Sequence, residues 1–272
     1  MLFIAMTVVS LWAQTNPPKP LARIALLSDP HVNRDTKGEN ASFKVHFEKT
    51  IAAVNNEKPD FVLISGDLTQ DGKPEQMADF KAHVKQFKTP VWFVAGNHDV
   101  GHKFNSGKKE GTITSERMAF FEKELGSAFF AEKKAGLRIL GITSSLLGSG
   151  FEREQQQWTF LEHELSKPAP TPTILFMHYP LFIKETTEPG GVYFNIEPEP
   201  RRHLFSLLKS GGVKTVLSGH LHRRLVNTND GVLFISSPPI SFGLPKGKEP
   251  EAWTLVTVFE DGTAKYEFRT IE

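Results

Sequence analysis

The chain has 272 residues, of which 39% are hydrophobic and 23% charged, and it carries 32 Lys and Arg against 31 Asp and Glu. This composition excludes a disordered chain, and the net charge of +1 argues against a general nucleic-acid binder, which needs a basic stripe. The absence of cysteine excludes a disulfide scaffold, a thiolate metal site and a cysteine nucleophile, so any metal must be held by nitrogen and oxygen ligands.

The N-terminus carries an uncharged apolar segment over residues 2–13. It is too short to span a bilayer, which needs about 20 residues, but it matches the apolar region of a secretory signal peptide. We therefore predict a signal peptide over 1–13, a linker over 14–20 and a single domain over 21–272, in a secreted or periplasmic protein. The alternatives are that the segment is a first strand of the fold or a retained lipid-facing anchor, and the protein is cytoplasmic if the segment is not a functioning signal. No later stretch is long and apolar enough to cross a membrane.

Short apolar runs alternate with helical patterns along most of the remaining chain, which predicts parallel α/β units. The predicted strands are Ile24–Leu27, Phe61–Ile64, Val91–Ala95, Ile139–Ile142, Thr173–Met177 and Lys214–Leu217. The predicted helices are Ser42–Asn55, Pro74–Phe87, Ser115–Leu125, Arg153–Ser166 and Pro200–Lys209.

The C-terminal part has a different pattern, with strands joined by turn dipeptides. Asn229, Asp230 and Gly231 favour one hairpin, and Asp261 with Gly262 favours another. The strands they join are Leu225–Val226, Val232–Ile235, Thr254–Phe259 and Lys265–Arg269. From these hairpins we predict a second, antiparallel sheet built from the C-terminal part.

Polar residues of the types that bind metals follow five of the predicted parallel strands. In open α/β sheets, ligands bind at the carboxyl ends of the strands, so these side chains are expected to meet. The candidate metal ligands are Asp29, His31, Asp67, Asn97, His178, His220 and His222. A metal site explains in particular why two histidines, His220 and His222, occur together at one strand end.

The spacing of the candidates adds to this prediction. In Asp29-x-His31 and His220-x-His222, two side chains of an extended segment point to the same side and can converge on one volume. Glycines precede three of the ligands or ligand pairs, where a tight turn brings the backbone close to a site. They are Gly66, Gly96 and Gly219.

The donor set of Asp, Asn and His suits Mn, Fe, Zn or Co better than Cu(I), and it is richer in nitrogen than Mg or Ca prefer. Seven ligands are too many for one catalytic ion with an open position. They suit two ions about 3.5–4 Å apart that share a bridging carboxylate. We therefore expect two divalent or trivalent ions, most simply Mn, Fe or Zn.

In this order and spacing the motifs resemble the complete signature of the calcineurin-like metallophosphoesterases. The resemblance implies an α/β fold, a four-layer αββα sandwich of two mixed β-sheets flanked by helices. It also implies a dinuclear centre that hydrolyses phosphate esters by attack of a metal-bridging hydroxide. One ion would take Asp29, His31, Asp67 and His222, and the other would take Asp67, Asn97, His178 and His220. Asp67 would bridge the ions, and His98 would lie against the substrate phosphate as a catalytic residue.

Differences from the motifs of particular subfamilies indicate which subfamily the chain resembles most. Gln70 stands where purple acid phosphatases carry a tyrosine ligand, and the aspartate that usually partners His98 has no counterpart in register, since Asp71 is one position off. The chain is most similar to the small calcineurin-like phosphoesterase-domain phosphatases, next to the class III cyclic-nucleotide phosphodiesterases. We therefore predict a phosphomonoesterase acting on a small molecule or a phosphoprotein. The alternatives are a phosphodiesterase on cyclic nucleotides or nucleotide diphosphates, and a non-catalytic scaffold.

Further residues are candidates for substrate binding. They are Asn97 and His98, with His102, Asn195 and Arg223. Asn195 belongs to a long loop, Lys184–Glu197, whose Tyr193 and Phe194 either cap the site or pack the loop down. Lys103, Lys108 and Lys109 predict a basic loop near the site that favours anionic substrates.

Overall fold

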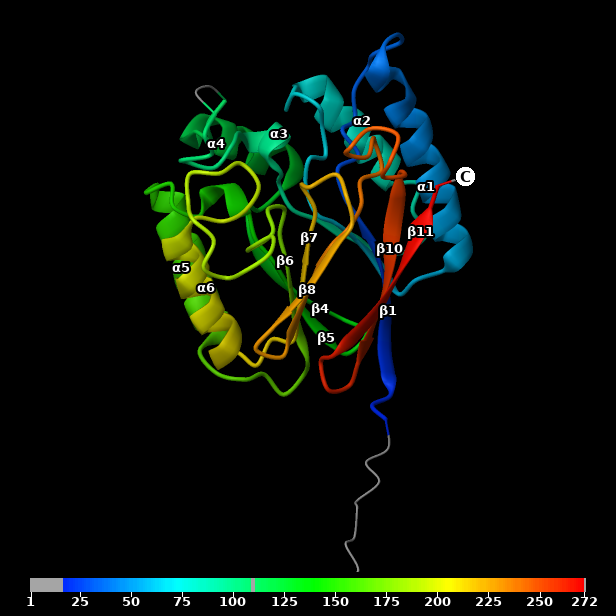
Figure 1. Ribbon diagram of the computed structural model, residues 1–272. Helices are drawn as coiled ribbons and strands as arrows, with labels where there is room; N and C mark the ends of the chain where they lie inside the picture. Colours follow the sequence, from blue (N-terminus) through cyan, green and yellow to red (C-terminus); the bar gives the residue numbers. More distant parts are fainter. Residues whose placement is uncertain (1–16, 109–110, 272) are drawn as a thin grey trace, which may run out of the picture.

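The computed structural model describes residues 17–108 and 111–271, so the predicted signal segment and the first three residues of the predicted linker lie outside the described residues. Two β-sheets lie face to face in the middle of the molecule, and helices cover the outer face of each sheet (Figure 1). This is the four-layer sandwich with two mixed sheets that the resemblance implies.

The first sheet has the strand order β11-β10-β1-β2-β3. Its strands β1, β2 and β3 run parallel, whereas β10 is antiparallel to β1 and β11 is antiparallel to β10. The elements that build this half are β1 (Pro20–Leu27), α1 (Phe43–Glu57), β2 (Phe61–Ile64), α2 (Pro74–Val84), β3 (Val91–Phe93), β10 (Ala252–Phe259) and β11 (Ala264–Thr270).

The second sheet has the strand order β4-β5-β6-β7-β9-β8, with parallel pairing from β5 through β9 and an antiparallel strand at each edge. Its strands are β4 (Phe130–Lys134), β5 (Leu137–Gly141), β6 (Thr173–Phe176), β7 (Thr215–Ser218), β8 (Leu225–Asn229) and β9 (Val232–Ser236). The remaining helices are α3 (Asn97–Val100), α4 (Ser115–Leu125), α5 (Glu152–Leu165) and α6 (Pro198–Ser210), with short 3₁₀ turns η1 (Glu39–Ser42) and η2 (Ser144–Leu146).

The prediction of an antiparallel second sheet made of the C-terminal strands is wrong. Both predicted hairpins form, but they join different sheets: β8 and β9 extend the second sheet, while β10 and β11 extend the first. Strand β4, whose pattern is mostly polar and exposed, was not predicted. A turn dipeptide specifies only the local hairpin, and the sheet that receives it is decided by long-range packing.

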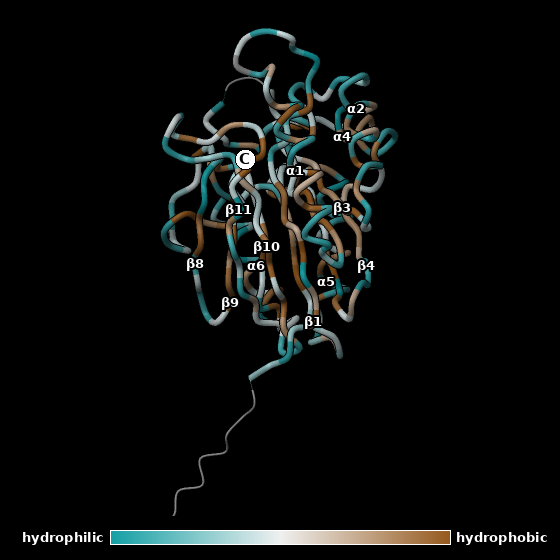
Figure 2. The backbone as a smooth tube through the Cα atoms, turned by 90° about the vertical axis from the view of Figure 1, so that its right-hand side faces the viewer, coloured by the Kyte–Doolittle hydropathy of each residue, from teal (hydrophilic) through white to brown (hydrophobic). Residues whose placement is uncertain are grey.

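Three hydrophobic cores follow from the alternation of side chains along the strands. In β1, Ile24 and Leu26 point between the two sheets, whereas Ala25 and Leu27 point toward α1 and α2. The third core lies between the second sheet and helices α5 and α6. Figure 2 shows the hydrophobic stretches running along the strands and the hydrophilic ones in the loops. Within the described part of the chain, no helix has the length and apolar character needed to cross a membrane.

Candidate metal centre

All seven predicted metal ligands come together at the carboxyl ends of the central strands, in loops supplied by both sheets. The first sheet contributes Asp29, His31, Asp67 and Asn97, and the second contributes His178, His220 and His222. The side chains of all seven are buried. The centre therefore lies at one edge of the interface between the two sheets.

Asp29, His31, Asp67 and His222 form what we call the first donor group, whose ligand atoms all lie within 4.8 Å of one another. The Nε2 atoms of His31 and His222 are 3.2 Å apart. Asp67 Oδ2 is 3.6 Å from His31 Nε2, and Asp29 Oδ1 is 3.4 Å from His222 Nε2. Four donors this close surround a volume suited to a single ion.

Asp67, Asn97, His178 and His220 form the second donor group. His178 Nε2 lies 3.3 Å from Asp67 Oδ1, 3.0 Å from Asn97 Oδ1 and 3.2 Å from His220 Nδ1. The two carboxylate oxygens of Asp67 thus face different groups, Oδ2 the first and Oδ1 the second. That is the geometry required of a bridging carboxylate.

The backbone reaches this arrangement through left-handed conformations. Asp29, His31, Asp67, His220 and His222 all have positive φ, between 46° and 70°. The expectation that Asp29-x-His31 and His220-x-His222 lie on extended segments is therefore wrong, although the side chains do converge. Asp and His are among the few non-glycine residues that tolerate this region, and such strain clusters at functional sites.

All three glycines that precede ligands are required by close packing, and a Cβ on Gly66 would lie 2.7 Å from His178 Nδ1. A Cβ on Gly96 would overlap the backbone nitrogen of Asp67, and a Cβ on Gly219 would overlap the hydroxyl of Ser28. Gly96 and Gly219 lie where loops from different strands touch. The prediction that the backbone approaches the site closely at these glycines is confirmed.

The outer nitrogens of three ligand histidines are held by backbone carbonyls. His178 Nδ1 donates to Ser65 O at 2.7 Å, His222 Nδ1 donates to Phe242 O at 2.7 Å, and His220 Nε2 donates to Tyr193 O at 3.2 Å. A carbonyl only accepts hydrogen bonds, so each outer nitrogen carries a proton and each inner nitrogen presents its lone pair to the centre. His220 therefore uses Nδ1, whereas His178 and His222 use Nε2.

The electrostatics of the cluster favour bound cations. Burial disfavours the charge on Asp29, but His222 and His178 outweigh burial and lower its pKa to about 2. Burial would also lower the pKa of His178, yet the carboxylates of Asp67 and Asp29 raise it to about 9. In addition, Asp29 Oδ1 is buried without a hydrogen-bond partner among the described residues. Two buried carboxylates that attract positive charge, with an unpartnered oxygen, fit a dinuclear metal site.

His98 follows Asn97 and lies beside the first donor group. Its Nδ1 donates to the carbonyl oxygen of Gln70 at 2.7 Å, so its proton exchange takes place at Nε2. Its imidazole packs edge-on against His31, with ring centroids 4.5 Å apart. Its backbone N–H donates to Asp67 Oδ1 at 2.8 Å. The hydrogen-bond partner of His98 Nδ1 is thus the backbone carbonyl of Gln70, and not the aspartate that usually occupies this role in the family that the sequence resembles.

The Lys184–Glu197 loop reaches the second donor group through Tyr193, a residue that the sequence left undecided. The hydroxyl of Tyr193 accepts from Asn97 Nδ2 at 3.3 Å, and its ring packs on that of His220 at 4.7 Å between centroids. Arg201 anchors the loop by donating to the carbonyl oxygens of residues 186, 188 and 196. Tyr193 therefore positions two ligands of the second donor group.

Other predicted residues lie in different surroundings. Asn195 is buried within the loop, where its Nδ2 donates to Glu188 Oε2 at 2.6 Å. Lys103 is fully buried and paired with Glu197, so it does not belong to an exposed basic loop as predicted. Arg223 is exposed beside His222. The substrate roles of Asn195 and Arg223 stay predictions.

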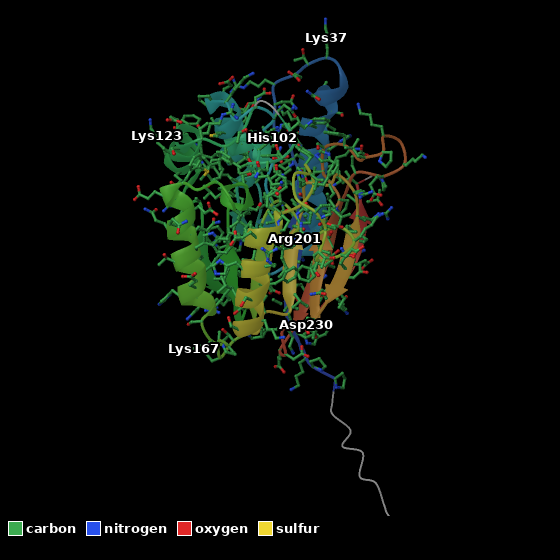
Figure 3. All side chains as sticks on the ribbon, turned by 60° about the vertical axis from the view of Figure 1, so that its left-hand side comes forward. Lys37, His102, Lys123, Lys167, Arg201 and Asp230 are labelled. Atoms are coloured by element: carbon green, nitrogen blue, oxygen red, sulfur yellow. The ribbon has the colours of Figure 1, made fainter. Side chains whose placement is uncertain are left out.

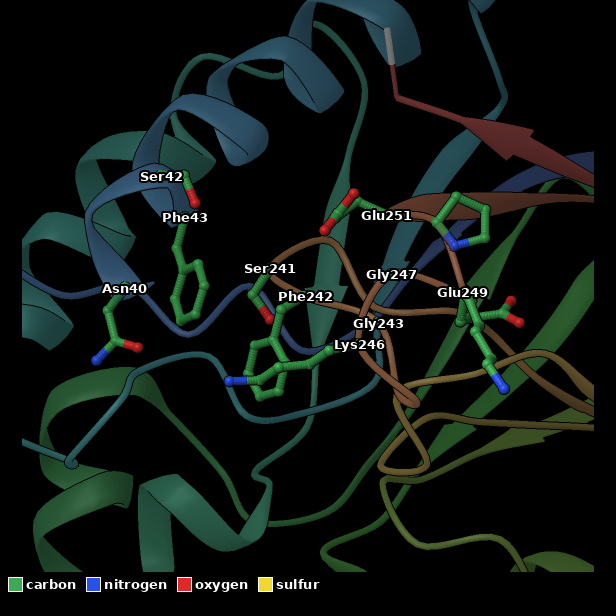
Figure 4. A pocket seen from close by; sticks show the side chains of 12 residues that line it. Asn40, Ser42, Phe43, Ser241, Phe242, Gly243, Lys246, Gly247, Glu249 and Glu251 are labelled. Atoms are coloured by element: carbon green, nitrogen blue, oxygen red, sulfur yellow. The ribbon is translucent and has the colours of Figure 1, made fainter. Parts of the chain in front are cut away.

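A large cavity of about 560 Å³ lies beside the first donor group (Figure 4). Phe43 and Phe242 stack in its wall, with centroids 5.3 Å apart and planes 15° apart. The ring of Phe242 is 4.2 Å from that of His222, and Phe43 is 6.3 Å from His31. The two phenyl rings therefore stand between this cavity and the first donor group.

Comparison with known families and proteins agrees with this geometry. A model described as calcineurin-like phosphoesterase matches residues 22–224. Human serine/threonine-protein phosphatase CPPED1 is 30% identical over 228 residues, which covers 78% of this chain and 68% of the relative. A probable glycerophosphodiester phosphodiesterase, GpdQ, from Arcobacter nitrofigilis is 31% identical over 209 residues, covering 74% of this chain and 71% of the relative.

Solved structures share the fold at low sequence identity. A dimetal phosphatase from Danio rerio superimposes with a TM-score of 0.58 and 13% identity, over 93% of this chain and 100% of the other. A purple acid phosphatase from yellow lupin gives a TM-score of 0.63 and 16% identity, over 94% of this chain and 52% of the other.

Proposed function

This chain belongs to the calcineurin-like phosphoesterase family of dimetal hydrolases, and we propose that within it the protein is a phosphomonoesterase that uses Mn, Fe or Zn. The observation that carries this proposal is the pair of donor groups that share Asp67 beside a histidine with a free Nε2. The named activity of the CPPED1 relatives supports the choice of monoesters.

The proposed ligands follow the two donor groups. The first ion would be held by Asp29, His31, Asp67 and His222, and the second by Asp67, Asn97, His178 and His220. When bound, the two ions supply positive charge for the phosphate oxygens and acidify water for attack. His98 acts at the leaving oxygen, because its Nδ1–H is fixed on Gln70 and a protonated Nε2 can donate.

The test is hydrolysis of p-nitrophenyl phosphate and of bis-p-nitrophenyl phosphate by protein reconstituted with each metal in turn. We expect two ions per chain and a higher kcat/KM for the monoester. A higher kcat/KM for the diester would overturn the monoester preference and leave the phosphoesterase assignment in place. A loaded protein that hydrolyses neither ester would favour the scaffold alternative.

A second candidate function is diester hydrolysis. The GpdQ relative is named a glycerophosphodiester phosphodiesterase, and a relative in Rhodococcus erythropolis, 27% identical over 225 residues, is named a probable cyclic nucleotide phosphodiesterase. The same dinuclear site can serve a diester if the cavity around it admits the second ester group. The two p-nitrophenyl esters separate this candidate from the first.

We also propose that the protein is exported, because the apolar segment over residues 2–13 matches a signal peptide. Expression of the full chain in a bacterial host should yield a periplasmic product whose N-terminus lies near Gln14. A soluble cytosolic product that retains Met1 would contradict export.

A further inference from the structure

A second, smaller cavity of about 220 Å³ lies beside His98, and it shares no lining residue with the cavity at Phe43 and Phe242. Its lining consists of Gln70, Asp71, Asn97, His98, His102, Gly111 and Arg117. Two of these residues hold buried polar atoms, Gln70 Oε1 and His102 Nδ1, that have no hydrogen-bond partner in the described part of the chain. Figure 3 labels His102 at the end of the molecule that carries Lys37 and Lys123. The cavity therefore offers polar groups that a ligand can satisfy.

Cationic side chains stand at and around this cavity. Burial lowers the pKa of His102, and the neighbouring His98, Lys108 and Arg117 lower it further, whereas the carboxylate of Asp67 acts in the opposite direction. Lys108 Nζ lies 4.9 Å from the ring centroid of Tyr193, whose ring in turn contacts His102. The cationic side chains of Lys108 and Arg117 therefore both lie near this half-buried imidazole, and their charges favour an anion in the cavity.

The acidic residue in the lining does not cancel this charge. The carboxylate of Asp71 accepts from Gln76 Nε2 at 2.9 Å and pairs with Lys73 Nζ at 3.0 Å. The guanidinium of Arg117 has no ion-pair partner among residues 17–108 and 111–271, although Arg117 lies on the first turn of α4 at the cavity wall. A planar guanidinium with free donors is the group best suited to bind a carboxylate or phosphate in two places.

The position of His98 says which part of a substrate enters this cavity. A general acid protonates the leaving oxygen, so the alcohol part of the ester must lie on the side of His98 Nε2. His98 lines the cavity, and its ring also packs edge-on against His31 of the first donor group, where an ion with the substrate phosphate would be held. The alcohol part of the substrate is thus directed toward His102 and Arg117.

We propose that this cavity is a second anion subsite, in which Arg117 and His102 bind a carboxylate or a second phosphate on the alcohol part of the substrate. The preferred substrates are then phosphomonoesters of acidic alcohols, whether small molecules or acidic phosphopeptides. The inference rests on the proposed function, because it assumes that the phosphate lies at the dinuclear centre and that His98 faces the leaving group.

The test compares two compounds that differ in one group: 3-phosphoglycerate, with a carboxylate, and glycerol 3-phosphate, with a hydroxymethyl group. Each is measured as a competitive inhibitor of whichever p-nitrophenyl ester the loaded protein hydrolyses. We expect 3-phosphoglycerate to bind about 10- to 100-fold more tightly, as a charge-assisted bond to a guanidinium predicts. Arg117→Gln should remove this difference and leave the inhibition by glycerol 3-phosphate unchanged.

The matched control is Lys123→Gln, which removes the same charge from an exposed position near the other end of α4. It should keep the full preference for 3-phosphoglycerate. Equal inhibition of the wild-type protein by both compounds would overturn the subsite. So would an Arg117→Gln variant that binds both compounds equally less well, since that would indicate a structural role. Failure of the proposed function is seen separately, as hydrolysis of the diester alone or of neither p-nitrophenyl ester.

Discussion

Replacement of His98 by glutamine is expected to slow the enzyme in a way that depends on the leaving group. The contact between residue 98 and the ligand Asp67 is a hydrogen bond from the backbone N–H of His98, at 2.8 Å. The substitution does not remove this bond, because glutamine has the same backbone N–H. The variant loses the hydrogen bond from Nδ1 to Gln70 O, worth about 1 kcal/mol of folding free energy. It should therefore fold and bind both metal ions as the wild-type protein does.

The expected loss of rate can be worked out from the position of the free nitrogen. With Nδ1 committed to Gln70, Nε2 is the atom that can give a proton to the leaving oxygen. General acid catalysis contributes about 10²–10⁴-fold, which corresponds to roughly 3–5 kcal/mol of activation free energy. An alkyl alcohol needs this proton to leave, whereas p-nitrophenolate leaves readily without it.

The assay is kcat/KM of wild-type and His98→Gln protein on glycerol 2-phosphate and on p-nitrophenyl phosphate, with metal content measured on the same samples. We expect the full 10²–10⁴-fold loss on the alkyl ester and a clearly smaller loss on the aryl ester. Equal losses on both esters with the metals intact would refute the acid role and favour electrostatic binding of the phosphate. Loss of metal would instead show that residue 98 supports the ions.

Three further predictions concern the centre. Asp67→Ala should empty both positions, because its two oxygens face different donor groups, and a variant that keeps one full equivalent by metal analysis would show that Asp67 is not shared. Tyr193→Phe removes the hydroxyl that accepts from Asn97 Nδ2 at 3.3 Å, so metal titration should show the second ion bound about 2- to 10-fold more weakly and the first unchanged; equal weakening of both would contradict this. Chelated protein should have its highest Tm near pH 6.5, the ordinary pKa of histidine. Below pH 6.5, His31 is protonated in the unfolded chain but stays neutral in the folded protein, where its pKa is lowered to about 3, so stability rises with pH. Above pH 6.5, His178 stays protonated only in the folded protein, where its pKa is raised to about 9, so its stabilisation is lost as the pH rises toward 9. A Tm that rises steadily from pH 6.5 to 9 would refute the assignment.

The ligand set was predictable from the sequence because of a geometric property of parallel sheets. Carboxyl ends of neighbouring parallel strands share one edge, so residues directly after apolar runs meet without any knowledge of the loops. Asp29, Asp67 and His178 each follow such a run, and each lies in the centre. To predict the ligands it was therefore enough to locate the ends of the strands, and the apolar runs in the sequence mark these ends.

The contacts that orient the ligands were not predictable in the same way. The groups that hold His178, His220 and His222 are backbone carbonyls, which every residue possesses, so no side-chain pattern marks them. Nothing local distinguishes Tyr193 from its neighbour Phe194, because the contact with Asn97 joins residues 96 positions apart. Likewise, no local signal assigns a hairpin to one of two sheets.

The first sheet is built from both ends of the domain. Strand β10, which begins at Ala252, lies against β1, so β1 remains an open edge until the last part of the chain has been synthesised. All seven ligands, the last at His222, leave the ribosome before that strand, and the second sheet is complete by Ser236. The order of synthesis thus allows the second sheet to form while the first sheet, which carries four of the seven ligands, still lacks strands β10 and β11. We therefore expect a chain that ends after Ser236 to bind metal ions more weakly than the full chain, because β1 then lacks its β10 partner.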